Sequence, residues 1–407
     1  MQLSKRLIAL GATTAIIISA CSGSTASPSA SAAATAASTA PSAPAASTAA
    51  STAPSAPAAA STAPSASAAA SQNTNWVACV AFDTGGLGDK GFNDLAKKGL
   101  DEAQAMGFTT HYSEAKGSTD YAANIQRLID QGCQSIIAVG FNQQVPTQNA
   151  ALKNPNIQFA QVDSLWDPSG PDGKVGTADD VKQPPNYTGL DFHIEEAAML
   201  AGYLVGGWSK TGIMGTFGGQ QFPGVTRFMD GYYAGIKYWD QEKGATVKLL
   251  GWDAVAQTGT FVNGDNPWGD AAKGESLAAG FVDQGADVVG PVAGSTGNGS
   301  IKYMASKNLW AIGVDTDQAI SLSQFSKAIL TSAQKVIDAA VLDTFKANAN
   351  GVVFSGGNYE GTLANGGVAL APFHDFDSQI SADLKAGIDT LKSKLVDGSV
   401  KVADYLK

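Results

Sequence analysis

Cysteine, histidine and charged residues are scarce in this chain of 407 residues, which contains three Cys, three His and 15% charged residues. Three cysteines are too few for a small fold held together by disulfides. No second long apolar run follows the N-terminal one, which excludes a polytopic membrane protein. The composition also excludes a collagen and a fully disordered chain.

One stretch, residues 22–71, lacks every large apolar, aromatic and charged side chain. It contains only Ala, Ser, Thr and Pro, apart from Gly23. Such a stretch cannot bury enough apolar surface to offset its ordering entropy, so it belongs to no folded domain. Its STAPSAP repeats, which begin at Ser38 and Ser51, predict a soluble tether of roughly 40 Å root-mean-square length.

A secretion signal precedes the tether. The run 7–20 is uncharged and mostly apolar, and it is too short to span a bilayer comfortably. It ends in Ile-Ser-Ala before Cys21, which resembles the lipobox of bacterial lipoproteins. We expect a signal peptide over 1–20 and a lipidated Cys21 that begins a tether over 21–75, on the outer face of the bacterial cell membrane. An ordinary secretory signal with a chance Cys is the alternative.

The remaining part of the chain is acidic. Lys5 and Arg6 are the only charged residues of 1–75, so the other 24 basic and 36 acidic residues give the rest a formal charge of −12. Nucleic-acid binding needs a basic footprint, and none is visible. No Lys/Arg cluster suggests adhesion to anionic lipid. We therefore expect no nucleic-acid partner, and membrane attachment only through the lipid anchor.

The other two cysteines, Cys79 and Cys133, lie in the part that we expect to fold. Two cysteines in an exported domain can pair. Cys79 lies in the first predicted strand and Cys133 just ahead of a later one, so neighbouring positions in a sheet are plausible. We predict a disulfide between them, with two buried free thiols as the alternative.

Short apolar runs alternate with helical patterns of ten to fifteen residues. Strands are expected at 76–82, 108–113, 135–141, 157–163, 187–192, 212–217, 246–252, 287–291, 310–315 and 328–331. Helices are expected at 93–106, 121–131, 143–152, 195–208, 224–239, 268–284, 299–307 and 333–347. This alternation predicts an α/β fold with parallel sheets that are covered on both faces. A break near residue 192 suggests two similar lobes.

Ligands of such sheets bind beyond the carboxyl ends of the strands. The residues that follow the predicted strands are carboxylates, amides, small residues and aromatics, whereas His and Cys do not recur there. This set suits hydrogen bonding to a neutral polyhydroxyl ligand that has a flat ring for stacking.

We do not expect an enzyme, a metal or a cofactor. None of the three histidines, His111, His193 and His374, lies beside a Ser or Cys at a strand end, and no H-E-x-x-H or CxxC is present. The glycine-rich run 85–88 lacks the Lys-Ser/Thr of a P-loop and the G-x-G-x-x-G order. A hydrolase that acts through Asp residues is an alternative that composition leaves open.

The strand ends resemble the basic membrane protein family of nucleoside-binding lipoproteins, which serve ABC importers. The resemblance begins with DTGGLGDKGFN at 83–93, close to the family's opening D-x-G-G-x-x-D-x-S-F-N. It covers nearly all of 76–407. Further matching segments are Phe159–Asp163, 196–203, 285–289, 293–297, 312–318, 330–335 and 365–368.

The resemblance implies a type I periplasmic-binding-protein fold, with two doubly wound parallel-sheet lobes joined by three crossing segments around a hinge and a ligand cleft. We expect lobe 1 to contain 76–191 plus about 325–348. Lobe 2 is expected to contain 192–324 plus about 349–407. The implied function is that of a monomer which captures a purine nucleoside and delivers it to the permease of an ABC importer. A sugar-binding lipoprotein of the same fold and a ligand-sensing surface lipoprotein are the alternatives.

The resemblance also implies roles for individual residues. Phe92 stacks on one face of the base, and Asn93 and Asp163 contact the edges of the base or ribose. Asp315 and Lys335 hold the ribose hydroxyls. From sequence alone, each of three residues also has a plainer reading: core packing for Phe92, a cap for Asp315, and a surface lysine at a helix start for Lys335.

The second stacking aromatic is either Phe261 or Trp268, because 262–267 looks like an insertion, and we favour Phe261. Gly91 stands where the family commonly has Ser, which removes a hydroxyl from the site. The other residues expected to contact the ligand are Asp83, Asp89, Phe141 and Gly294.

The segment 166–185 is longer and more acidic than a plain connection between a strand and a helix. Its clustered Asp and Gly residues would suit a calcium loop, but they do not match the EF-hand pattern. A solvated acidic loop is the alternative, and we expect no metal.

Overall fold

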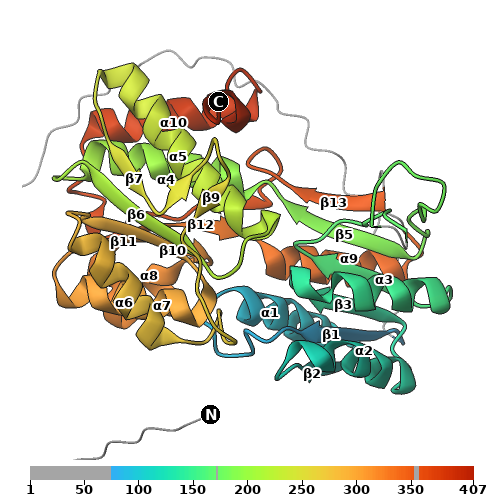
Figure 1. Cartoon of the computed structure of the whole chain (residues 1–407). Coiled ribbons are helices and arrows are strands. Elements are labelled where there is room, and N and C mark those ends of the chain that lie inside the picture. The colour runs from blue at the N-terminus through green and yellow to red at the C-terminus, as the bar shows by residue number, and fades with distance from the viewer. Residues whose placement is uncertain (1–74, 171–172, 353–356) are drawn as a thin grey trace, which may run out of the picture. The chain divides into compact units, whose positions relative to one another are not determined.

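The computed structural model describes residues 75–170, 173–352 and 357–407 (Figure 1). The expected signal peptide, Cys21 and all but the last residue of the tether lie outside these ranges. Within them, no helix is long and apolar enough to cross a membrane.

The first of two six-stranded sheets has the order β13-β5-β4-β3-β1-β2, and every neighbouring pair is parallel. Its order reverses between β3 and β1, which places the topological switch point there. The strands are β1 (Val77–Phe82), β2 (Thr109–Glu114), β3 (Ser135–Val139), β4 (Gln158–Val162), β5 (Tyr187–Phe192) and β13 (Asn358–Gly361).

Helices cover both faces of this sheet (Figure 1). Side chains alternate along β1, so that Val80 packs toward one helix pair while Cys79 and Ala81 pack toward the other. The first pair is α1 (Phe92–Ala105) and α9 (Ile337–Ala349), and the second is α2 (Tyr121–Asp130) and α3 (Gln144–Lys153).

The second sheet has the order β14-β12-β11-β10-β6-β7 and is parallel except for β14, which runs antiparallel to β12. Its switch point lies between β10 and β6. The strands are β6 (Ile213–Gly218), β7 (Lys248–Leu250), β10 (Val288–Val292), β11 (Trp310–Asp315), β12 (Ile329–Lys335) and β14 (Val368–Leu370). A separate antiparallel pair comprises β8 (Trp252–Asp253) and β9 (Thr258–Gly259).

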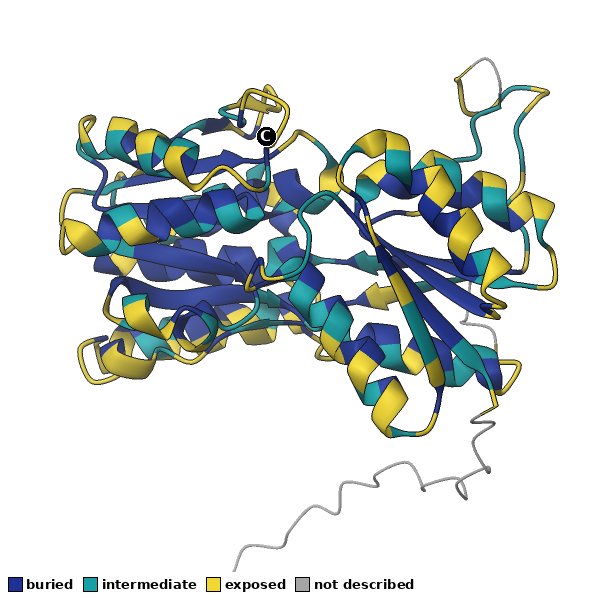
Figure 2. Cartoon of the chain, turned by 90° about the horizontal axis from the view of Figure 1, so that it is seen from below, coloured by how far each residue is buried: buried dark blue, intermediate teal, exposed yellow. Residues whose placement is uncertain are grey.

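The helices around the second sheet are again divided between its faces, and the strands between them are buried (Figure 2). Met229 packs on one face and Phe281 on the other. The helices are α4 (Ile194–Trp208), α5 (Pro223–Lys243), α6 (Ala271–Val282), α7 (Gly294–Ser306), α8 (Gln318–Ser321) and α10 (Ala382–Val396). We call the first sheet with its helices lobe 1 and the second lobe 2.

The strand pairing corrects the expected lobe boundaries at two places. Segment 325–348 was assigned to lobe 1, but its strand β12 pairs with β11 in lobe 2, and only α9 packs on lobe 1. Segment 349–407 was assigned to lobe 2, but β13 pairs with β5 in lobe 1. The partner of β13 lies far away in the chain, so local sequence patterns do not show it, whereas β12 pairs with β11, the strand just before it.

Local sequence patterns were also misleading about where several helices and strands begin and end. A helix was expected from residue 333, but β12 continues to Lys335, because it is paired with β11 on one side and with β14 on the other. A long strand was expected at 246–252, but the chain bends at Gly251, whose φ is +85°. Helix α7 begins at Gly294, earlier than its glycine-rich start suggested.

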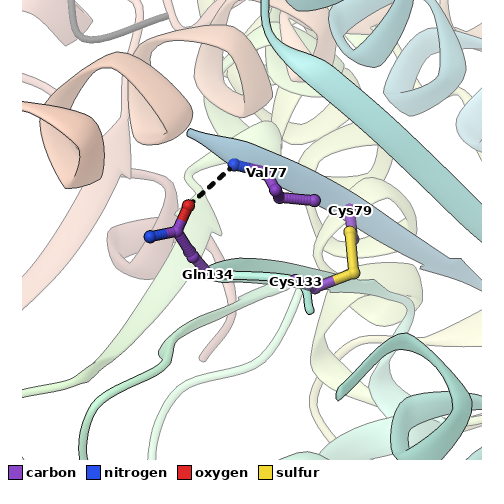
Figure 3. Close-up of a disulfide and its surroundings, with 4 residues drawn as sticks. All are labelled: Val77, Cys79, Cys133 and Gln134. Atoms are coloured by element: carbon purple, nitrogen blue, oxygen red, sulfur yellow. Dashed lines mark hydrogen bonds between the residues drawn. A yellow bond between two sulfur atoms is a disulfide. The ribbon is translucent and has the colours of Figure 1, made fainter. Parts of the chain in front are cut away.

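The predicted disulfide between Cys79 and Cys133 is present in lobe 1, with a Cα–Cα distance of 6.0 Å (Figure 3). It joins β1 to the residue that lies two positions before β3. Beside it, Gln134 Oε1 accepts a hydrogen bond from the backbone N–H of Val77 at 3.1 Å. The bridge lies on the α2–α3 face of the sheet, and the cavity described below lies at the carboxyl ends of the strands.

Candidate ligand-binding site

A partly open cavity with an empty volume of about 520 Å³ lies where the carboxyl ends of strands from both sheets meet. Apolar rings and a few buried polar groups converge on it, as is typical of small-molecule sites. The loops that follow β1 and β3 line it from lobe 1, and the loops that follow β6 and β10 line it from lobe 2. These two pairs of strands flank the switch points of the two sheets. The lining includes these predicted residues: Asp83, Asp89, Phe92, Asn93, Phe141, Asp163, Trp268, Gly294, Asp315 and Lys335.

The loop between β1 and α1 is organised by two buried carboxylates. Asp83 Oδ1 accepts hydrogen bonds from the Gly85 backbone N–H at 2.8 Å and from Asn93 Nδ2 at 3.0 Å. The Asp89 carboxylate accepts hydrogen bonds from the backbone N–H groups of Gly91 and Asn93, at 3.0 and 2.8 Å. Asp89 thereby fixes the start of α1, and with it the position of Phe92.

Lys335 is the centre of the polar part of the site. Its ammonium donates to Asp163 Oδ2 at 2.6 Å and to the Gly224 carbonyl oxygen at 3.1 Å. It also lies 5.5 Å from the ring centroid of Phe92 and 5.0 Å from that of Phe228. The Lys335 side chain is 1% exposed, so the reading as a surface lysine is wrong.

Asp315 ends β11 with its carboxylate in the cavity, 3.9 Å from Lys335 Nζ. It does not cap the following helix, whose N-cap residue is Asp317. Asp163 and Asp315 have φ values of +60° and +65°, a conformation that non-glycine residues adopt rarely and that is often found at functional sites.

Burial changes the acidity of the cavity's carboxyl groups. Burial raises the pKa of Asp315 to about 7, and nearby Lys335 only partly opposes this rise. Burial raises the pKa of Asp83 to about 6, against the opposing hydrogen bonds from Asn93 and Gly85. Near neutral pH each of these two carboxyl groups is therefore partly protonated.

The aromatic rings of the cavity come from both lobes. Phe92 and Trp268 line it, and Phe141 of lobe 1 stacks on Phe222 of lobe 2 with ring centroids 5.0 Å apart and planes 12° apart. Trp268 packs against Phe222 at 5.7 Å. Trp268 also lies so close to the Gly219 backbone that a side chain at Gly219 would clash with the indole.

Phe261 does not line this cavity whereas Trp268 does, so the geometry favours Trp268 over the Phe261 that the sequence suggested. It pairs edge-to-face with Trp252 at 6.1 Å and borders a separate, open hollow beyond Phe141 and Phe222. The β8–β9 pair precedes it, and the segment 262–267 carries the chain on to Trp268. The residues that looked like an insertion, 262–267, therefore lie before Trp268, the aromatic residue that lines the cavity.

Two aromatic residues of the site were not predicted. Phe222 stands four residues after β6, and its position after a strand end was a usable signal. Phe228 lies inside α5, where only knowledge of which face of the helix turns toward Lys335 would identify it. Gly224 was also missed: a Cβ there would lie 2.6 Å from Asp163 Oδ2, so its lack of a side chain permits the lobes to approach.

The described residues contain no group of three or more His, Cys, Asp or Glu side chains placed to hold a metal ion. In the acidic segment 166–185, which is described apart from residues 171 and 172, Asp180 accepts hydrogen bonds from the backbone N–H groups of Gly176 and Thr177. These contacts satisfy the carboxylate within its own turn.

Comparison with known proteins shows a family match over most of the chain. A family model described as ABC transporter substrate-binding protein PnrA-like matches residues 77–403. An ABC transporter nucleoside-binding protein of Lactococcus lactis is 29% identical over 350 residues, which cover 81% of this chain and 89% of the relative. Basic membrane protein A of Borreliella burgdorferi is 28% identical, with coverages of 78% and 85%. An uncharacterized lipoprotein of Pyrococcus horikoshii is 30% identical, with coverages of 67% and 63%.

Solved structures show the same fold. An ABC transporter solute-binding protein of Aeropyrum pernix superposes with a TM-score of 0.68 at 23% identity, and covers 80% of this chain and 92% of its own. A second, from Conexibacter woesei, has a TM-score of 0.59 at 19% identity, with coverages of 81% and 100%. The architecture is therefore the two-lobe fold of periplasmic binding proteins.

Proposed function

Because this chain belongs to the PnrA-like family of ABC transporter substrate-binding proteins, we propose that it captures a purine nucleoside between its lobes and delivers it to the permease. The main support is that one cavity combines aromatic rings with a buried carboxylate beside a lysine. A nucleoside offers a flat base to the rings and a diol to the carboxylate. The name of the Lactococcus lactis relative supports the same ligand class.

In this proposal the base lies between Phe92 and Trp268, and Asn93 reads its edge. Asn93 Nδ2 is used by Asp83 and Asp89, whereas its buried Oδ1 has no hydrogen-bond partner among the described residues. A buried acceptor without a donor is costly. The site therefore favours a base that brings an N–H to this position.

The ribose lies against Asp315 and Lys335. Two adjacent hydroxyls donate to the Asp315 carboxylate, which accepts hydrogen bonds but donates none when ionised. The Lys335 ammonium has three N–H groups, of which Asp163 and the Gly224 carbonyl take two. The third is available for a ribose oxygen.

Delivery follows from the topology. The chain crosses between the lobes at 192–194, 335–337 and 361–368, as the ends of the paired strands and helices show. Rotation about these segments opens the cavity, and closure brings Phe92 of lobe 1 against Asp315 and Lys335 of lobe 2. The closed form is the species that docks on the permease.

We further propose that the chain is a monomer anchored through a lipid on Cys21, with 1–20 removed and 21–75 as the tether to the outer face of the bacterial membrane. The lipoprotein name of the Pyrococcus horikoshii relative supports the anchor. Attachment of a labelled fatty acid to the wild-type chain, and its loss in Cys21→Ala, test the anchor directly.

The ligand is tested by the melting temperature of the full chain, since a ligand that binds only the folded state stabilises it. Inosine, guanosine or adenosine should raise the melting temperature, and the Phe92→Ala variant should respond less. A rise with ribose or glucose but with no nucleoside would overturn the proposal in favour of a sugar-binding protein. Free base released from inosine would indicate a hydrolase instead.

Nucleotides provide a second discriminating ligand set. Among the described residues that line the cavity, Lys335 is the one cation, and Asp163 already neutralises it. A phosphate would meet the carboxylates of Asp83, Asp89 and Asp315 without a free cation to pair with. Nucleoside 5′-phosphates should therefore bind more weakly than the parent nucleosides.

A further inference from the structure

The loop that carries Phe92 turns its backbone carbonyls toward the opposite lobe. The Asp89 carboxylate holds this loop through four hydrogen bonds, from the backbone N–H groups of Gly91, Asn93 and Asp94 and from the side chain of Asn93. Lys90 adopts a φ of +61°. This turn leaves the carbonyl oxygens of Asp89 and Lys90 available as acceptors.

Lobe 2 donates a side-chain hydrogen bond to each of these two carbonyls. Asn298 Nδ2, from α7, donates to the Asp89 carbonyl oxygen at 2.9 Å. Ser321 Oγ, from the end of α8, donates to the Lys90 carbonyl oxygen at 2.9 Å. Neither donor is among the residues that line the cavity.

Hydrogen bonds through Gln318 connect Asn298 to the strand that carries Asp315. Gln318 Nε2 donates to Asn298 Oδ1 at 3.0 Å, and Gln318 Oε1 accepts the backbone N–H of Val314 at 3.0 Å. The backbone N–H of Gln318 donates to Ser332 Oγ at 3.0 Å. Gln318 is 3% exposed, so its amide is fixed in one orientation by partners on both sides.

We propose that Asn298, Gln318 and Ser321 form a clasp that positions the Phe92 loop relative to Asp315 when the lobes close. The clasp sets the spacing between the ring that stacks on the base and the carboxylate that holds the ribose. It rests on the proposed nucleoside function and adds residues that act without touching the ligand. Because these contacts form only between closed lobes, the clasp slows ligand release and leaves the choice of base unchanged.

The first test is the rate of inosine release from the full chain, followed by stopped-flow fluorescence of Trp268 and the other tryptophans. Asn298→Ala and Ser321→Ala should each release inosine about 3- to 10-fold faster with little change in the association rate, because each removes one hydrogen bond between the lobes. Ser321→Thr keeps the hydroxyl and should restore slow release. Ser323→Ala, a matched serine on the exposed surface nearby, should behave as wild type.

Two further variants separate positioning from general destabilisation. Asn298→Asp keeps the acceptor for Gln318 but loses the donor to the Asp89 carbonyl, so it should release inosine as fast as Asn298→Ala. In a Phe92→Ala background, Asn298→Ala should have little additional effect, because the clasp acts through that ring. Equal effects of Asn298→Ala in both backgrounds would overturn the proposal.

Hydrogen exchange of the full chain without ligand gives a readout that does not depend on the proposed function. Loss of Asn298 should speed exchange of the amides at 91–94, and leave those of β3 unchanged. If wild type binds no nucleoside but this exchange response appears, the nucleoside proposal fails and the clasp stands. If nucleosides bind but neither exchange nor release changes in Asn298→Ala, the clasp is refuted.

Discussion

The Lys335 ammonium of lobe 2 lies 2.6 Å from Asp163 Oδ2 of lobe 1, and the two side chains are 1% and 6% exposed. This ion pair stands at the carboxyl end of β12, where the chain crosses to α9, which begins at Ile337. A charge buried this deeply persists only with a partner. The pair therefore links the hinge, the two lobes and the proposed ribose site.

Lys335→Met should lower the free energy of unfolding by about 3–5 kcal/mol, because it leaves the Asp163 carboxylate buried without its cation. Chemical denaturation of the ligand-free protein measures this loss. The double variant Asp163→Asn/Lys335→Met should recover part of it.

Lys385→Met is the matched control for this loss. Lys385 pairs with Asp377 at 2.7 Å, but the two side chains are 31% and 63% exposed. Water screens such a pair, so its removal should cost no more than about 1 kcal/mol. A similar loss of unfolding free energy in both lysine variants would show that burial does not strengthen the Lys335–Asp163 pair.

Trp268→Ala and Phe92→Ala should each weaken nucleoside binding by about 1–3 kcal/mol, the usual cost of losing a stacking ring. Isothermal titration with inosine measures the change. Phe261→Ala serves as the control, because Phe261 packs on Trp252 outside the cavity. A larger loss for Phe261→Ala than for Trp268→Ala would reverse our choice of stacking residue.

Most of the cavity could be predicted from the sequence. Parallel strands end at the same edge of their sheet, so the residues that directly follow them in the chain lie close together there. Asp83, Asp163 and Asp315 each stand at the end of a predicted strand or directly after it. Phe228 was not predicted, since its role depends on how α5 packs. Phe261 was preferred over Trp268 because an insertion leaves sequence spacing ambiguous, and only the folded β8–β9 region resolves it.

Lobe membership was harder to predict than element type. Strand β13 pairs with β5, which ends at Phe192, and no local pattern records so distant a partner. Strand β12 pairs with β11, the strand just before it, and was misplaced because it was assigned together with the helix that crosses to lobe 1. The helix expected at Ala333 had good local propensity, but hydrogen bonds to β11 and β14 override it.

The pH dependence of stability should be set in part by Asp83 and Asp315. Burial raises their pKa values to about 6 and about 7, whereas Asp in an unfolded chain titrates near 4. Between these values the folded state binds more protons than the unfolded state, so stability falls as pH rises from about 4 to about 7. Asp315→Asn should reduce this slope in denaturation measured across the range.

Nucleoside affinity should change with pH in the opposite direction. A ribose diol donates to the ionised Asp315 carboxylate, so inosine should bind more tightly as pH rises from about 6 to about 8. Titrations in Asp315→Asn should lose this dependence. An affinity that falls over this range would contradict the proposed role of Asp315.

Gly91→Ser should be tolerated and should strengthen ligand retention. Gly91 is the N-cap residue of α1, and its φ of −160° lies outside the left-handed region. A Cβ there would lie 3.9 Å from the Cβ and Oδ2 of Asp315, so the hydroxyl can bond the carboxylate across the lobes. Inosine release slowed by about 2- to 10-fold is expected, with Gly91→Ala as the control that lacks the hydroxyl.

Removal of the disulfide should affect stability but not the ligand site. The bridge closes a loop with a sequence separation of 54, for which a loss of about 2–4 kcal/mol is typical. Cys79→Ser/Cys133→Ser should show this loss in chemical denaturation and bind inosine with unchanged affinity. A large loss of affinity would mean that the bridge also controls the strand ends.

The pairing of β13 with β5 has a consequence for how the protein is made. The backbone edge of β5 has no partner on that side until residues 358–361 have been synthesised, although β5 itself ends at Phe192. Unpaired strand edges promote aggregation while a chain is incomplete. Lobe 1 therefore matures only after strands β6 to β12 of lobe 2 have been synthesised, and a chain truncated before residue 358 retains an open edge for misassembly.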